Sequence, residues 1–112
     1  LLSVACKPVP DTRHEIDEAA VERGKIAIER VQCGACHAIP GIDWPEGRLG
    51  PSLAGLDQQG LIGGALPNTP ANLAAFVRNA PRPRPGSTMP AMPLSETEAR
   101  DVAAYLLTMS DR

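Results

Sequence analysis

Prolines and glycines limit where this chain can form regular structure. The sequence of 112 residues contains 12 prolines and 10 glycines, and both residue types interrupt helices. They are densest in residues 40–67 and 81–93, which show neither a helical nor a strand period. Helices are therefore expected only before, between and after these stretches. The length fits one domain, which we place at residues 12–112, after an N-terminal leader or anchor segment at residues 1–11.

One helix is predicted before the first of these stretches. Thr12-x-x-Glu15 matches a capping box, in which two side chains satisfy free N–H groups at a helix start. Small or apolar residues then recur at helical spacing, which predicts a single buried face. They are Ile16, Ala20, Gly24, Ala27 and Val31. This helix should run into Cys33.

Two further helices are predicted downstream. Thr69 as N-cap ahead of Pro70 predicts a helix that continues to about Arg78. Ser95-x-x-Glu98 is a second capping box, and an apolar helical stripe follows it. The stripe consists of Ala99, Val102, Tyr105, Leu106 and Met109. No stretch alternates in the manner of a strand, so the predicted fold is all-α, with three main helices joined by Pro/Gly-rich loops.

Composition and charge exclude several classes of protein. The 11 basic and 13 acidic residues give a net charge of −2, which argues against binding nucleic acid through a global positive field. The uncharged run 58–77 contains too many glycines and prolines for a membrane span. Trp44, Phe76 and Tyr105 are the only aromatic residues, although aromatic side chains usually dominate a core. Something other than aromatic residues is therefore expected to fill the interior.

The strongest local signal is Cys33-Gly34-Ala35-Cys36-His37. A reactive dithiol of the thioredoxin type needs a strand before the cysteines and a helix after them, whereas here a helix precedes and a loop follows. A structural zinc site would need Cys6 or His14 as a fourth ligand, and the chain lacks a second paired-ligand motif. The remaining interpretation is covalent attachment of haem c, for which this spacing is the attachment signature. Cys33 and Cys36 would then form the thioethers and His37 would bind the iron.

Haem iron in an electron carrier takes a second axial ligand, and a methionine raises its reduction potential. Met109 lies on the apolar stripe of the last predicted helix and is expected to fill the core. Met89 and Met92 lie instead in a stiff, proline-rich loop. One of these two should be the sixth ligand.

At this point the chain resembles the class I cytochrome c family over roughly residues 20–109. The resemblance rests on the Cys33–His37 motif, on Gly50-Pro51-Ser52-Leu53-Ala54-Gly55-Leu56, on Pro85-Gly86-Ser87-Thr88-Met89-Pro90 and on the closing Val102-Ala103-Ala104-Tyr105-Leu106 helix. The fragment Leu66-Pro67-Asn68-Thr69-Pro70-Ala71-Asn72-Leu73 is similar to bacterial members, including haem c domains attached to terminal oxidases.

The resemblance implies roles around the haem. The carbonyl of Pro51 would accept the Nδ1 proton of His37, and Leu53 would pack on the histidine side of the porphyrin. Met89 matches the axial methionine and is preferred over Met92. Phe76 stands where many members have Tyr or Trp. Trp44 matches no family role and is expected to pack over a haem edge or a loop.

The resemblance also implies a contact between the first and last helices. Gly24 and Tyr105 match the positions where these helices cross, with glycine allowing close approach of the two backbones. Many members carry an aromatic residue one turn after this glycine, where the chain has Ile28. This departure predicts a shifted or looser crossing.

One-electron transfer between respiratory redox partners is the function that the resemblance implies, with no enzymatic activity of its own. A fixed electron-entry subunit of a terminal oxidase or dehydrogenase is the first alternative, and a catalytic or gas-sensing haem with an open sixth position is the second. Arg78, Arg82 and Arg84 precede the methionine loop, and we expect them to dock an acidic patch on the partner.

Haem c would place the protein in the periplasm or on the outer face of the bacterial membrane. Leu1-Leu2-Ser3-Val4-Ala5-Cys6 resembles the end of a lipoprotein signal, which predicts membrane attachment through Cys6. The haem itself would supply the large apolar core piece that three aromatic residues do not provide.

Overall fold

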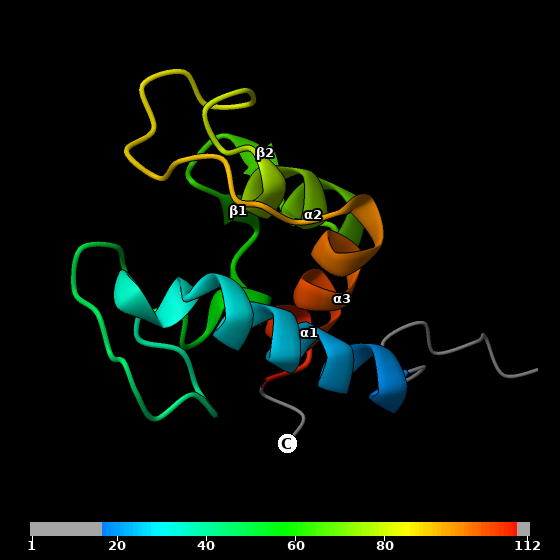
Figure 1. The fold of residues 1–112 in the computed structure, drawn as a ribbon. Helices are drawn as coiled ribbons and strands as arrows, with labels where there is room; N and C mark the ends of the chain where they lie inside the picture. The colour runs from blue at the N-terminus through cyan, green and yellow to red at the C-terminus, as the bar shows by residue number, and fades with distance from the viewer. Residues whose placement is uncertain (1–16, 110–112) are drawn as a thin grey trace, which may run out of the picture.

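Three helices, joined by long irregular segments, make up most of the regular structure. The computed structural model describes residues 17–109. Its main helices are α1 (Glu18–Val31), α2 (Pro70–Arg78) and α3 (Glu96–Leu107), as Figure 1 shows. Two short 3₁₀ helices, η1 (Cys33–Ala35) and η2 (Leu56–Gln58), lie between α1 and α2. The predicted number and order of the main helices are confirmed.

Helix α1 begins later and ends earlier than predicted. Asp17 caps it, because its side chain accepts a hydrogen bond of 3.1 Å from the N–H of Ala20. The predicted capping box, Thr12 and Glu15, lies outside the described residues. At the other end Gln32 adopts the left-handed conformation, with φ of 61°. The helix therefore stops before Cys33, and the cysteines lie in a separate turn.

The buried face of α1 is rotated relative to the prediction. Its buried residues are Val21, Gly24, Ala27 and Ile28. Ala20 and Val31, both expected on this face, are half-buried, and Ile16 lies outside the described residues. The difference arises because the crossing with α3, rather than the average period of apolar residues, decides which side is covered.

The crossing of α1 and α3 is close, not loose. An added Cβ on Gly24 would lie 2.6 Å from the carbonyl carbon of Asp101 and 3.1 Å from the nitrogen of Val102. Only glycine permits this approach of the two backbones. Ile28, in place of the aromatic residue of many family members, is 1 % exposed, so the expectation of a looser crossing is wrong. Gly24 meets α3 at Asp101 and Val102, one turn before Tyr105.

Two ion pairs join the same helices at the surface. The guanidinium of Arg23 donates two hydrogen bonds to Asp101, of 3.1 Å from Nε and 3.3 Å from the terminal nitrogen. Arg30 and Glu98 form the second pair. Asp101 is 7 % exposed, and a carboxylate so buried needs a partner. These pairs fix the relative placement of the two helices.

The starts of α2 and α3 are as predicted. Thr69 accepts a hydrogen bond of 3.1 Å from the N–H of Asn72, with Pro70 in the first helical position. Ser95 and Glu98 form the complete capping box of α3, with each side chain bonded to the other residue's N–H. Met109 is buried in the core cluster, as expected.

A small β-hairpin was not predicted. Strand β1 (Leu61–Ile62) pairs antiparallel with β2 (Leu66–Pro67), and residues 63–65 form the turn. Strands of two residues are too short to produce an alternating pattern, so the sequence gives no sign of them. Ile39 and Ile42 form an isolated bridge as well.

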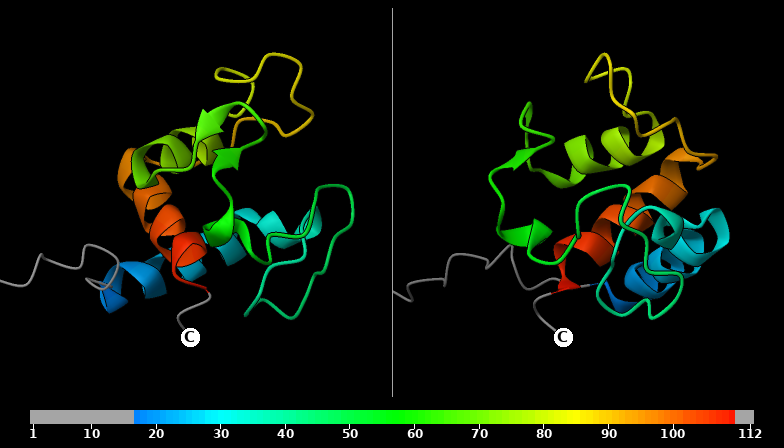
Figure 2. Two further views of the ribbon diagram at one scale, coloured as in Figure 1. Left: turned by 180° about the vertical axis from the view of Figure 1, so that it is seen from behind. Right: turned by 90° about the vertical axis from the view of Figure 1, so that its left-hand side faces the viewer.

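Two long loops extend on the same side of the helices. Residues 38–53 leave the end of α1, and residues 79–94 connect α2 to α3 (Figures 1 and 2). The first follows the Cys33–His37 motif and the second contains Met89 and Met92. Within residues 17–109 no helix has the length and apolar character needed to cross a membrane.

Candidate functional site

The two cysteines of the motif lie in a single turn beside the core. Cys33 opens η1, and the N–H groups of Cys36 and His37 both donate to its carbonyl, at 3.2 and 3.0 Å. Both thiols are free and half-buried. Burial raises the pKa of the Cys33 thiol, whereas a reactive dithiol requires a lowered thiol pKa. Cys33 thus lacks the lowered thiol pKa of a redox-active pair, and both thiols belong to one turn.

His37 is held by the loop that follows it. Its Nδ1 lies 2.7 Å from the carbonyl oxygen of Pro51. A carbonyl oxygen only accepts, so Nδ1 carries the proton and the Nε2 lone pair is left for another partner. This is the hydrogen bond that the resemblance implied, and it gives His37 the tautomer that binds a metal through Nε2.

Two backbone hydrogen bonds join the motif to the same loop, and a third joins the two ends of the loop. The N–H of Gly47 donates to the carbonyl of Gly34 at 2.7 Å, that of Gly50 to Cys36 at 2.7 Å and that of Leu53 to Ala38 at 2.9 Å. Together with the bond between His37 and Pro51 they tie residues 34–38 to residues 47–53. We call residues 38–53 the proximal loop, because they hold His37.

Gly50 has a role that the sequence did not reveal. An added Cβ at this position would lie 2.7 Å from Nδ1 and 2.9 Å from Nε2 of His37. The imidazole therefore occupies the space that any other residue's side chain would need. The dipeptide Gly50-Pro51 was noted only as part of a motif, and nothing in the residue types themselves indicates the ring contact.

The methionines lie on the second loop, which we call the distal loop (residues 79–94). Met89 and Met92 are both half-buried and pack against the core cluster. The N–H of Met89 donates to the hydroxyl of Ser87 at 3.2 Å. The structure thus places both candidate ligands at the edge of the core.

Phe76 and Leu53 are half-buried apolar residues at the margin of the core. The ring of Phe76 faces the turn of the hairpin, since an added Cβ on Gly63 would lie 3.3 Å from two of its ring carbons. Cys33 lies at the same margin. Apolar side chains from four separate segments, including Met89, are thus partly exposed around the core.

Trp44 does not pack over any neighbour. Its side chain is 85 % exposed, and that of Leu49 in the same loop is 88 % exposed. The expectation that Trp44 covers a loop is therefore wrong for the described residues. Arg78, Arg82 and Arg84 are exposed, whereas Cys6 and His14 lie outside the described residues.

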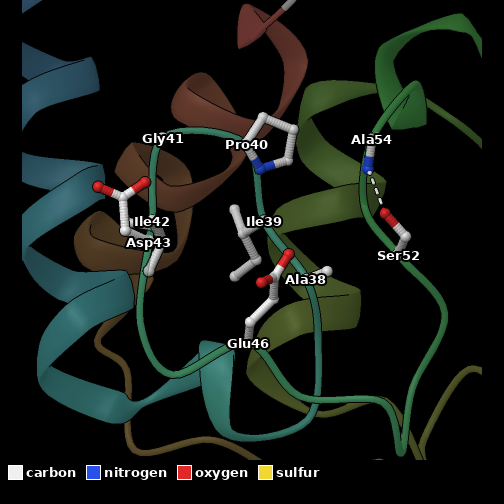
Figure 3. Close-up of a pocket in the computed structure, with 9 residues that line it drawn as sticks. All are labelled: Ala38, Ile39, Pro40, Gly41, Ile42, Asp43, Glu46, Ser52 and Ala54. Carbon is white, nitrogen blue, oxygen red and sulfur yellow. Dashed lines mark hydrogen bonds between the residues drawn. The ribbon is translucent and has the colours of Figure 1, made fainter.

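A hollow in the described part of the chain lies away from these side chains. It has a volume of about 300 Å³ and is bordered by Ile39, Asp43, Glu46 and Ser52 of the proximal loop (Figure 3). Neither the cysteines, His37 nor a methionine lines it. No cluster of three or more metal-binding His, Cys, Asp or Glu residues occurs within residues 17–109, which gives no support there to the zinc interpretation.

Together, three helices, a Cys-x-x-Cys-His turn and a histidine oriented by a proline carbonyl define a small c-type cytochrome domain. The family model described as cytochrome c oxidase, cbb3-type, subunit III matches residues 19–106. The chain belongs to this family of class I cytochrome c domains, which is associated with terminal oxidases.

A relative supports the same family. The chain is 30 % identical over 96 residues to a protein of Alkalihalophilus pseudofirmus named cytochrome c oxidase subunit 2. The match covers 85 % of this chain but only 27 % of the relative. The chain thus spans about a quarter of the length of that protein.

The family implies haem c, and the residues present fit it. The two free thiols share one turn, and His37 has Nε2 available because Pro51 accepts the Nδ1 proton. Partly exposed apolar side chains at the core margin, Leu53, Phe76 and Met89 among them, match the needs of a flat apolar group. The family thereby assigns the domain to haem-based electron transfer.

Proposed function

We propose that the domain carries one covalent haem c and transfers single electrons between respiratory partners. When bound, haem supplies iron that cycles between Fe(III) and Fe(II). Cys33 and Cys36 would each add S–H across one vinyl group, which loses no atom and needs no oxidant. The observation that carries the proposal is the 2.7 Å contact between Nδ1 of His37 and the Pro51 carbonyl, since it leaves Nε2 unprotonated for the iron.

Met89 is the proposed sixth ligand. Its place in Pro85-Gly86-Ser87-Thr88-Met89-Pro90 matches the axial methionine of the resembling family, and its half-buried position at the core margin supports the assignment. Sulfur ligation raises the reduction potential relative to a second histidine. An electron carrier with both axial positions filled needs little rearrangement on reduction.

Absorption spectra test both assignments. We expect a low-spin ferric protein with a sulfur-to-iron charge-transfer band that disappears in Met89→Ala and persists in Met92→Ala. The reverse pattern would make Met92 the ligand. A resting five-coordinate, high-spin iron would replace electron transfer by the alternative of a catalytic or gas-sensing haem. Loss of covalent haem in Cys33→Ala and Cys36→Ala, measured by mass spectrometry, tests the thioethers.

Arg82 and Arg84 are the proposed docking residues for an acidic redox partner. Both are exposed on the distal loop, and the chain has no acidic residue between Asp57 and Glu96. Such a charged surface steers a partner and makes association depend on salt. Replacing both residues by Glu should slow electron transfer to a partner at low salt and weaken its salt dependence. Unchanged rates would refute the docking.

A fixed position in an oxidase complex is the second candidate. It is favoured by the match to a protein named cytochrome c oxidase subunit 2. On either account the domain works in the periplasm or on the outer face of the membrane. Co-purification with a membrane complex would favour the fixed subunit over a mobile carrier. Membrane attachment through Cys6 is tested by mass spectrometry of the native N-terminus, where an unacylated Cys6 would exclude it.

A further inference from the structure

Arg78 joins the two ends of the distal loop. As the last residue of α2, its carbonyl oxygen accepts a hydrogen bond of 3.0 Å from the N–H of Met92. Its side-chain Nε donates a second bond, also 3.0 Å, to the carbonyl oxygen of Leu94. One residue thus binds the returning chain at two points, with Pro93 between them.

The returning chain is itself anchored in the core. Leu94 is 6 % exposed and belongs to the core cluster, and its N–H donates to the Met92 carbonyl at 2.8 Å. Ser95 directly after it caps α3. The Leu94 carbonyl therefore lies where lost bonding to Arg78 is costly, because a partly buried acceptor would be left unpaired.

Between these points the distal loop is bonded mainly to itself. The backbone N–H of Arg82 donates to the carbonyl of Asn79 at 3.2 Å. In the same way the backbone N–H of Arg84 donates to Ala80 at 3.1 Å and that of Ser87 to Arg84 at 3.0 Å. Within the described residues, no backbone hydrogen bond joins residues 80–91 to the proximal loop or to α1. The backbone at Met89 is consequently held by the turns inside the loop and by what closes its base, while its side chain packs against the core cluster.

We propose that Arg78 is a positioning residue for Met89. Its guanidinium, bonded to the Leu94 carbonyl, closes the base of the distal loop and keeps the Met89 sulfur at the iron. This inference rests on the proposed function, in which Met89 is the sixth ligand. Arg78 also remains one of the arginines expected to dock a partner, because the residue is exposed and only its Nε is engaged within the fold.

Two substitutions of similar shape distinguish the effect of the hydrogen-bond donor of Arg78 from the effect of the rest of its side chain. Arg78→Met places a methyl group where Nε now lies, and so removes the donor. Arg78→Gln places an amide N–H at the same distance along the side chain, and so keeps a neutral donor. Arg100→Met is the control, since it removes one exposed arginine from α3.

Imidazole binding to the ferric holoprotein gives the decisive measurement. At saturating imidazole the rate of binding is limited by dissociation of the methionine. We expect this rate to rise about tenfold in Arg78→Met, as the loss of one hydrogen bond to a charged donor implies. Arg78→Gln should remain within about threefold of the parent protein, and Arg100→Met should be unchanged.

Amide hydrogen exchange in the reduced protein supplies an independent readout. The Met92 amide, which donates to Arg78, should exchange faster in Arg78→Met and not in Arg78→Gln. Faster exchange with an unchanged imidazole rate would overturn the proposal, since the contact would then be structural only. Equal rates in all variants would overturn it as well.

Failure of this inference is distinguishable from failure of the proposed function. If the charge-transfer band survives in Met89→Ala, the ligand assignment is wrong. If that band is lost but Arg78→Met exchanges its ligand at the parent rate, only the positioning role is wrong. Should Arg78→Met yield no holoprotein, a normal Arg78→Gln supports the donor role. Failure of both variants to hold haem contradicts it, because the charge would then be needed for folding.

Discussion

The proximal and distal loops are both irregular and proline-bearing, but they are held in different ways. The proximal loop, residues 38–53, is tied directly to the Cys33–His37 turn by two backbone hydrogen bonds and by the bond from His37 to Pro51, and a third backbone bond joins its own ends. The distal loop, residues 79–94, is bonded to itself and closed at its base by Arg78. The loop that holds His37 is thus bonded to the site itself, whereas the loop that holds Met89 is held at its base.

This difference predicts how each side of the site responds to mutation. On the histidine side the ligand and its support are in contact, so a shift of the loop is a shift of His37. On the methionine side the support lies several residues from Met89, so the loop can be altered locally without removing it. Three experiments test the contrast and a fourth tests the start of α3, which lies outside both loops; they run from the largest expected effect to the smallest.

The largest effect is expected from Gly50→Ala. The added Cβ would lie 2.7 Å from Nδ1 of His37, so the ring must move and the bond to Pro51 must break. We expect a loss of about 3 kcal/mol in the free energy of unfolding, at the upper end for overpacking, and a lower ratio of haem to protein. Gly60→Ala is the control, because nothing lies within 4 Å of an added Cβ there. Normal haem content in Gly50→Ala would contradict the conclusion that the proximal loop holds His37 rigidly.

The next experiment inserts one glycine into each loop. An insertion after Arg48 changes the register between the bonds made by Gly47 and Gly50, which should cost about 2 kcal/mol for two lost hydrogen bonds. An insertion after Pro85 affects only the turn closed by the bond from Ser87 to Arg84 and should cost about 1 kcal/mol or less. Urea unfolding of the two holoproteins measures the difference. Equal losses would show that the loops are held alike.

Tyr105→Phe tests whether α3 supports the proximal loop. The Tyr105 hydroxyl donates a 2.6 Å hydrogen bond to the carbonyl of Pro40, three residues after His37. Its removal should cost about 1 kcal/mol in the free energy of unfolding. We expect the charge-transfer band to persist, since the distal loop is not involved. A loss of that band would mean that the two sides are coupled.

The smallest effect concerns acid pH and neither loop. The N–H of Ser95 bonds to Glu98, and this bond together with Arg30 holds the pKa of Glu98 below its ordinary value of 4.5. A lowered carboxyl pKa contributes stability above the ordinary pKa that is lost as the pH falls through the folded-state pKa. Glu98→Gln should therefore be less stable than the parent at neutral pH and lose less on acidification. The measurement is the urea midpoint of unfolding at neutral pH and at acid pH. Glu96→Gln, outside the capping box, is the control.

Much of this architecture could be predicted from residue types alone. Thr69-Pro70 and Ser95-x-x-Glu98 mark the starts of α2 and α3, because capping depends on side chains only three residues apart. The haem-attachment motif, the family and the number of helices follow from local patterns in the same way. The bond between His37 and Pro51 was implied by resemblance and is present.

Features that depend on distant contacts could not be predicted. The buried face of α1 follows from the approach of Gly24 to the Asp101 backbone, and a helical period does not contain that information. The role of Arg78 depends on where the carbonyl of Leu94 lies. Trp44 was expected to pack over a haem edge or a loop, yet no loop of the described residues covers its side chain, which is 85 % exposed.

The close crossing of α1 and α3 also bears on the order in which parts of the chain fold. Arg23 and Asp101 are 78 positions apart in the chain, so their helices meet only after nearly everything between them has been synthesised. Contacts of such long range form late in folding. Throughout that interval the Cys33–His37 segment belongs to a chain whose first and last helices have not yet met. When α3 docks against Gly24, that segment is enclosed between two packed helices and the loops that join them.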